Sequence, residues 1–124
     1  MSPIGTHYLI DFWGVSPAIL NSPTWLAKTM TVAIKRGQLT EVDRVTKWFD
    51  PQGVTMIGVL AESHISFHTY PEERYIAVDI YSCGQRGRPE EAIDVLMEHF
   101  APESFDIRQI TRGERPRESI SGPS

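Results

Sequence analysis

Residues 54–83 read VTMIGVLAESHISFHTYPEERYIAVDIYSC, and this stretch decides the fold. Residues 54–61 form a nearly continuous apolar run of strand length, which is typical of a buried strand. Residues 65–70 continue in an extended pattern that Pro71 ends, and residues 74–83 give the strongest strand pattern of the chain. The connections between these runs are too short for a crossover, so the sequence predicts neighbouring antiparallel strands.

A strand and a helix are predicted at the N-terminal side of this stretch. Residues 7–13 are rich in β-formers and end before a glycine, which indicates a strand. Residues 23–36 carry apolar side chains at helical spacing. Pro23 must stand at a helix start, so we expect Ser22 to be the N-cap and Gly37 to end the helix.

The remaining segments complete an α/β pattern. Residues 40–49 give a weaker strand signal that the turn at residues 50–53 closes. A second helix is predicted to begin at Arg88, and residues 104–111 are a last strand candidate. We therefore predict a two-layer α/β sandwich, with a mostly antiparallel sheet and two helices on one face. A second copy of the chain could cover the other face.

Composition narrows the class of protein. The chain has 124 residues, a mass of 14.0 kDa and a net charge of −4, which suits one domain and argues against nucleic-acid binding. Its single cysteine, Cys83, excludes an intramolecular disulfide. No apolar run approaches a membrane span and no signal peptide is visible, so we expect a cytoplasmic protein with no membrane partner.

Polar side chains in the middle of the chain are unexpected for a plain core. Residues 62–72 contain two histidines, several hydroxyl residues and carboxylates between two apolar strands. His64, His68 and Cys83 could hold a metal, although three ligands are a weak signal. Cys83 could instead be a nucleophile with His68 as its base. The third alternative is that these side chains are ordinary core residues with satisfied hydrogen bonds.

A family resemblance favours one chemistry among these. The segments that carry it are Glu62-Ser63-His64, His68-Thr69-Tyr70-Pro71-Glu72, the strand with Tyr75, Ala77 and Asp79, and Ser82-Cys83-Gly84. They resemble the pyruvoyl-dependent S-adenosylmethionine decarboxylases of the short prokaryotic kind, whose pattern reads ESH, HTWPE and TCG. The resemblance implies one decarboxylase-like domain over residues 1–112, and we expect a disordered tail over residues 113–124.

The resemblance implies a proenzyme that cleaves itself between Glu62 and Ser63. The Ser63 hydroxyl would attack the Glu62 carbonyl, and His68 would then remove the Cα proton of Ser63. Elimination and hydrolysis would leave a pyruvoyl group at position 63, which would be the only cofactor, with no metal. Thr55 stands where the family has an assisting serine, and it keeps the hydroxyl.

Decarboxylation would follow from the same residues. The pyruvoyl carbonyl formed from Ser63 would make a Schiff base with the substrate amine and withdraw electrons while carbon dioxide leaves. By resemblance, the Cys83 thiol would then donate a proton, which suits a group with an ordinary pKa near 8.5. The product would be an aminopropyl donor for polyamine synthesis.

The expected substrate is S-adenosylmethionine, with arginine or ornithine as the alternative. Phe49 and Glu72 match family positions near the adenosine of S-adenosylmethionine, and Tyr70 replaces the usual tryptophan. Asp50 stands where an apolar residue is expected, and this extra carboxylate would suit arginine or ornithine. A non-catalytic regulatory paralogue is a further alternative. The family also implies a homodimer with both chains lining each site.

Overall fold

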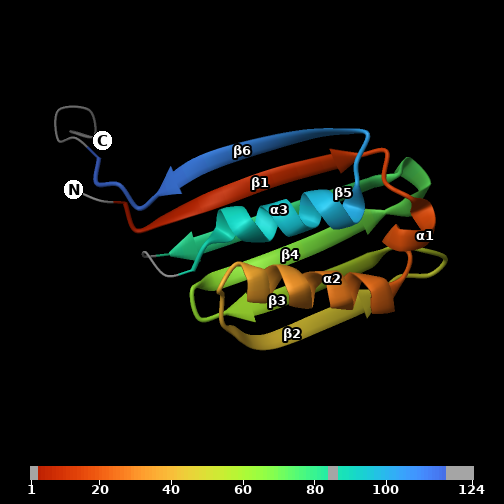
Figure 1. Ribbon diagram of the computed structural model, residues 1–124, viewed down its shortest axis with the longest axis horizontal. Coiled ribbons are helices and arrows are strands. Elements are labelled where there is room, and N and C mark those ends of the chain that lie inside the picture. The colour runs from red at the N-terminus through yellow and green to blue at the C-terminus, as the bar shows by residue number, and fades with distance from the viewer. Residues whose placement is uncertain (1–2, 84–86, 117–124) are drawn as a thin grey trace.

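Within residues 3–83 and 87–116, which the computed structural model describes, six strands form one antiparallel sheet (Figure 1). The strands are β1 (Gly5–Trp13), β2 (Glu41–Trp48), β3 (Val54–Leu60), β4 (Ser63–Tyr70), β5 (Tyr75–Cys83) and β6 (Ser104–Arg112). Their order in the sheet is β2-β3-β4-β5-β1-β6. The strands β4 and β5, which carry Ser63, His68 and Cys83, therefore lie at the centre.

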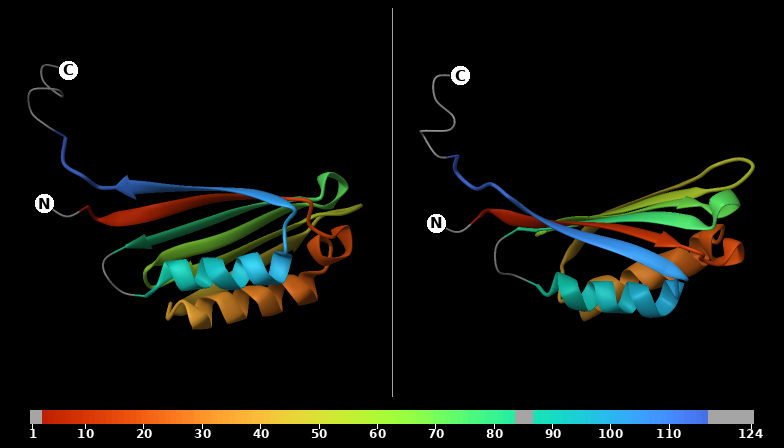
Figure 2. Two further views of the ribbon diagram at one scale, coloured as in Figure 1. Left: turned by 45° about the horizontal axis from the view of Figure 1, so that its top comes forward. Right: turned by 90° about the horizontal axis from the view of Figure 1, so that it is seen from above.

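The helices cover one face of this sheet only (Figure 2). They are α1 (Pro17–Leu20), α2 (Pro23–Arg36) and α3 (Pro89–Phe100), and a 3-10 turn at Pro71–Glu73 joins β4 to β5. The N-cap prediction is confirmed, because the Ser22 hydroxyl accepts a hydrogen bond from the Trp25 N–H at 3.1 Å. Gly37 is the C-cap, as expected.

The core fills the space between the helices and the sheet. Phe100 of α3 contacts Phe12 of β1 and Phe67 of β4, with ring centroids 5.9 and 5.5 Å apart. All three rings are almost completely buried, and each contributes roughly 1.5–3 kcal/mol through the area it removes from water. This packing holds β1 and β4 against α3 and leaves their other face free.

We call the sheet face opposite α2 and α3 the open face. Buried and half-buried side chains alternate strictly along β5, so every second residue points to this face. The open-face side chains of β1, β4 and β5 are His7, Leu9, Asp11, Trp13, His64, Ser66, His68, Tyr70, Tyr75, Ala77, Asp79, Tyr81 and Cys83. Three of them are histidines and four are tryptophan or tyrosine, and so many rings are unusual for a face that only meets water.

The predicted two-layer α/β sandwich is confirmed, with small differences in its elements. β4 begins at Ser63, two residues earlier than predicted, and α1 was not predicted because a four-residue helix shows no full period. Residues 113–116 have no regular structure, whereas residues 117–124 and Gly84 lie outside the described residues. Among the residues described, no helix is both long and apolar enough to cross a membrane.

Candidate active site

The turn between β3 and β4 holds the peptide bond between Glu62 and Ser63. The carbonyl oxygen of Glu62 accepts a hydrogen bond from the backbone N–H of Cys83 at 2.9 Å. The Glu62 side chain is buried, and its Oε1 accepts a hydrogen bond from the Thr40 N–H at 3.0 Å. Both ends of Glu62 are therefore fixed, and its carbonyl oxygen faces a donor that can stabilise negative charge.

The backbone of Ser63 is in an unusual conformation at this bond. Its φ is 156°, on the positive side that residues with a Cβ rarely adopt. Such a conformation costs on the order of 1–3 kcal/mol and needs neighbouring contacts to hold it. In the register of β4 and β5, Ser63 lies opposite Ser82, next to Cys83. We call Glu62, Ser63 and Cys83 the cleavage end of the sheet.

A pocket of about 290 Å³ lies at the other end of β4. Thr55 of β3 and His68 of β4 lie opposite each other, and Oγ1 of Thr55 is 3.3 Å from Nδ1 of His68. The residues that line the pocket are Phe49, Gln52, Gly53, Thr55, His68, Thr69, Tyr70 and Glu72. We call this region the pocket end. Five of its residues were predicted from the sequence to be site residues: Phe49, Thr55, His68, Tyr70 and Glu72.

The structure does not bring Ser63 and His68 of one chain together. They are five positions apart (68 − 63 = 5) on one extended strand, which places their Cα atoms about 16 Å apart. An imidazole cannot span that distance, and Thr55 lies just as far away because it pairs with His68. The selected residues therefore form two half-sites at opposite ends of β4.

Asp50 lies beside the pocket end but does not line its cavity. It lines a neighbouring cavity of about 190 Å³ together with Trp48, Phe49 and Pro51. Phe49 lines both cavities, so the two are neighbours. Asp50 is exposed to solvent. The walls of the pocket end are therefore formed without Asp50.

Sequence reasoning missed a polar cluster near the cleavage end on the open face. His7 Nε2 lies 3.2 Å from Asp79 Oδ1, and the Ser66 hydroxyl donates to Asp79 Oδ2 at 3.4 Å. The His7 ring also meets His64 edge-on, with centroids 6.0 Å apart. Burial lowers the pKa of His64, and the neighbouring His7 adds to this effect. These contacts join three strands, so only the register could have revealed them.

An aromatic row crosses the open face near the pocket end. Tyr75 stacks on Trp13 on one side and on Tyr70 on the other, with centroids 4.3 and 5.6 Å apart. The Tyr75 hydroxyl donates to Asp11 at 2.5 Å, and burial together with this hydrogen bond raises its pKa. The row gives the pocket end a rigid, flat border of the kind that binds planar groups.

A metal site of His64, His68 and Cys83, and a Cys83 nucleophile with His68 as its base, do not fit the geometry of one chain. Cys83 lies at the cleavage end and His68 at the pocket end, so His68 cannot act as its base or share a metal with it. Within residues 3–83 and 87–116, no group of three or more His, Cys, Asp or Glu side chains is placed to hold a metal ion. The thiol of Cys83 is half-buried and free of any disulfide.

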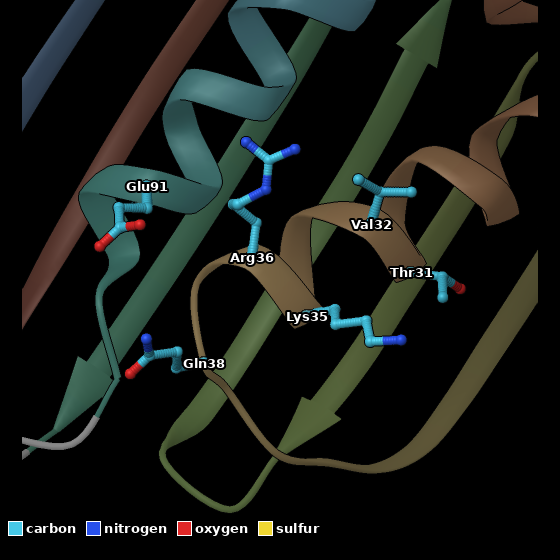
Figure 3. Close-up of a pocket in the computed structure, with 6 residues that line it drawn as sticks. All are labelled: Thr31, Val32, Lys35, Arg36, Gln38 and Glu91. Atoms are coloured by element: carbon cyan, nitrogen blue, oxygen red, sulfur yellow. The ribbon is translucent and has the colours of Figure 1, made fainter.

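A larger cavity of about 590 Å³ lies on the helix layer, away from both half-sites. Figure 3 shows its two basic side chains pointing apart: Arg36 extends toward α3, whereas Lys35 extends away from it. Glu91, on its far side, is paired with Arg88 at 3.6 Å. Because the charged groups do not converge on one point, this cavity is not a prepared binding site.

Comparison with known proteins identifies the family of the chain. The sequence model of a family described as S-adenosylmethionine decarboxylase matches residues 6–113. An S-adenosylmethionine decarboxylase proenzyme of Picrophilus torridus is 36% identical over 117 residues, covering 94% of this chain and 90% of that protein. A proenzyme of the same name from Parasynechococcus marenigrum is 39% identical, covering 88% of this chain and 85% of that protein.

A solved structure is similar over almost the whole chain. The crystal structure of the adenosylmethionine decarboxylase from Aquifex aeolicus superposes with a TM-score of 0.87 at 30% identity, covering 95% of this chain and 98% of that one. The sequence comparison and the structure comparison thus indicate the same family, each over most of the chain. The chain belongs to the S-adenosylmethionine decarboxylase family.

Proposed function

We propose that the chain is a proenzyme that cleaves itself between Glu62 and Ser63 and then decarboxylates S-adenosylmethionine with a pyruvoyl group made from Ser63. One observation carries the proposal: the carbonyl oxygen at the bond to be cleaved already accepts a hydrogen bond from the Cys83 N–H at 2.9 Å. This bond continues the ladder between β4 and β5, and it holds the carbonyl beside the free thiol of Cys83.

The first step is an acyl shift at the cleavage end. The Ser63 hydroxyl attacks the carbonyl carbon of Glu62, a C–O bond forms, and the C–N bond to Ser63 breaks. Negative charge that develops on the Glu62 oxygen is stabilised by the Cys83 N–H. Loss of the peptide bond also releases Ser63 from its φ of 156°, which favours the ester.

The second step needs a base at the Cα of Ser63. The imidazole of His68 accepts the Cα proton of Ser63, and the ester bond between oxygen and the Cβ of Ser63 breaks. The first fragment then leaves with Glu62 as its C-terminal carboxylate. Addition of water and loss of ammonia convert the resulting dehydroalanine into the pyruvoyl group. Because His68 of the same chain is about 16 Å away, we infer that the base is the partner's His68.

A homodimer through the open face supplies this geometry. In this dimer the two open faces stack, and the two-fold axis lies between the sheets, parallel to them and perpendicular to the strands. The rotation reverses the strand direction, so the cleavage end of one chain lies over the pocket end of its partner. Each of the two sites would then combine Ser63 and Cys83 of one chain with the partner's Thr55 and His68. The polar and aromatic open face, half-buried in the single chain, is suited to such an interface.

We expect the processed protein to sediment at no less than twice the 14.0 kDa of one chain, and its activity per chain to fall on dilution. The reason is that a separated chain holds two incomplete half-sites. Sedimentation velocity and carbon dioxide release, measured over the same dilution series, check this. A 14.0 kDa species that keeps full activity at every concentration would contradict the dimer.

The residues of the assembled site divide the work of decarboxylation. The pyruvoyl group supplies an electron-withdrawing carbonyl to the amine of the substrate. Cys83 holds a half-buried thiol at the cleavage end, where it can donate a proton to the carbon that loses carbon dioxide. The pocket end, with Phe49 and Glu72, would bind the adenosine through its ring and its hydroxyls.

The position of Asp50 distinguishes the two substrate classes. A pocket bordered by Phe49, Tyr70 and the Tyr75–Trp13 row suits an adenine base, whereas Asp50 lines a neighbouring cavity that shares only Phe49 with it. We therefore favour S-adenosylmethionine over arginine or ornithine. A cytoplasmic location is also predicted for this enzyme.

Carbon dioxide release from S-adenosylmethionine, arginine and ornithine, each offered to processed protein, should be high only for the first. Asp50→Asn should leave that rate nearly unchanged, because Asp50 does not line the pocket. If arginine or ornithine is the substrate, the same change should remove an ion pair worth up to about 4 kcal/mol before desolvation. That result would correct the substrate and leave the self-cleavage intact.

A further inference from the structure

The two edges of the sheet are protected to different degrees. β2 forms one edge and β6 the other (Figure 1). β2 carries a register shift between Glu41 and Asp43, and its Arg44 is anchored to Glu41 and to Thr31 of α2. Lys47 also lies on this strand. Bulges and lysines are the usual devices that stop an edge from pairing with another chain, so the β2 edge is blunted.

β6 has none of these devices. It runs for nine residues without a bulge, a proline or a lysine, and every one of its residues is exposed. It pairs with β1 along its whole length, and among the described residues no strand pairs with its outer edge. Phe105, Ile107 and Ile110 are 53%, 38% and 43% exposed. A long, regular, partly apolar edge of this kind is a template for strand addition.

The charge pattern of β6 identifies the strand that fits it. Asp106 and Arg108 flank Ile107 and lie on the open face, where they form an exposed ion pair at 3.0 Å within the chain. In an antiparallel pairing of β6 with a second β6, one register places Ile107 opposite Ile107 on a two-fold axis. That register brings Asp106 opposite the partner's Arg108, and Arg108 opposite the partner's Asp106. The two-fold axis therefore forms two ion pairs between the chains.

The neighbouring registers are unfavourable. A shift by two residues in one direction places Asp106 opposite itself, and the same shift in the other direction places Arg108 opposite itself. Like charges directly opposite one another destabilise a strand pair. The favoured register also places Phe105 opposite the partner's Gln109 and overlaps residues 104–110 of both strands. The sequence Asp-Ile-Arg is therefore self-complementary on this edge.

We propose that a second copy of this chain pairs edge to edge through β6, in the register centred on Ile107, and joins the two sheets into one continuous sheet. This contact uses an edge of the molecule, whereas the proposed active-site dimer uses its open face. Both contacts can form in one assembly, and the edge contact doubles the mass whether or not the open faces pair.

Charge reversal tests the register. Asp106→Arg and Arg108→Asp should each raise the dissociation constant of the edge contact at least about tenfold, because two matched pairs become two repulsions. The double variant, with both changes, restores the complementary pattern in reverse and should recover the wild-type mass. Sedimentation velocity over a concentration series, at low and high salt, measures each assembly, and circular dichroism checks that each variant is folded.

The other edge provides the matched control. Asp43→Arg makes the same change of charge on β2 and should leave the mass unchanged. A wild-type protein whose mass never exceeds that of the Asp106→Arg variant, or a double variant that stays dissociated like the single ones, would overturn the proposal. Because Asp106 and Arg108 lie on the open face, cleavage between Glu62 and Ser63 is measured by intact-mass spectrometry in every variant. A variant that is still cleaved but has lost mass has lost the edge contact and kept the active-site dimer.

Discussion

Ser63→Ala is expected to leave every molecule as an intact chain of 124 residues, whereas the wild-type chain yields two fragments, residues 1–62 and 63–124. The reason is chemical: without the hydroxyl, nothing can attack the Glu62 carbonyl, although the Cys83 N–H still faces it. The same change should abolish carbon dioxide release, because no pyruvoyl group can form. Intact-mass spectrometry is the measurement, since fragments of equal length nearly co-migrate on a gel.

Ser66→Ala is the matched control for this prediction. Ser66 lies on the same strand and is buried, but its hydroxyl donates to Asp79 and has no part in the cleavage. This variant should be processed like the wild type. Cleavage at another bond, or an intact wild-type chain, would exclude the proenzyme. Continued cleavage of Ser63→Ala would show that a different nucleophile acts.

The sequence was sufficient for the elements of the fold because each strand and helix carries its own local signal. The continuous apolar run of β3 and the alternation in β5 predicted their strands, and Ser22 with Pro23 marked the first residue of α2. The four residues of α1 gave no such signal, because one helical turn has no period to detect.

The arrangement of the site could not be predicted in the same way. Ser63 and His68 are close in the sequence, but an extended strand turns five positions into about 16 Å and places them at opposite ends of the sheet. Conversely, His7 and Asp79 are 72 positions apart and lie in contact. Residue types indicated the chemistry, whereas only the strand register showed that the machinery is divided into two half-sites.

Because the site is divided into two half-sites, two inactive variants are expected to complement each other when they form a mixed dimer. Ser63→Ala lacks the nucleophile and His68→Ala lacks the base, so neither variant expressed alone should be cleaved. In the proposed mixed dimer, the cleavage end of the His68→Ala chain meets the pocket end of its partner, whose His68 is intact. Co-expression with two different tags should therefore yield cleaved His68→Ala chains, up to about half of them if the chains pair at random.

The outcome separates the two possible geometries sharply. If each chain had to use its own His68, no pairing could restore processing, and both variants would stay intact in every mixture. Capture on one tag followed by intact-mass spectrometry of both chains shows that mixed dimers formed and which chain was cut. Cleavage confined to the His68→Ala chain is expected, because the half-sites lie about 16 Å apart on β4 and only a partner reversed across the open face can bring them together.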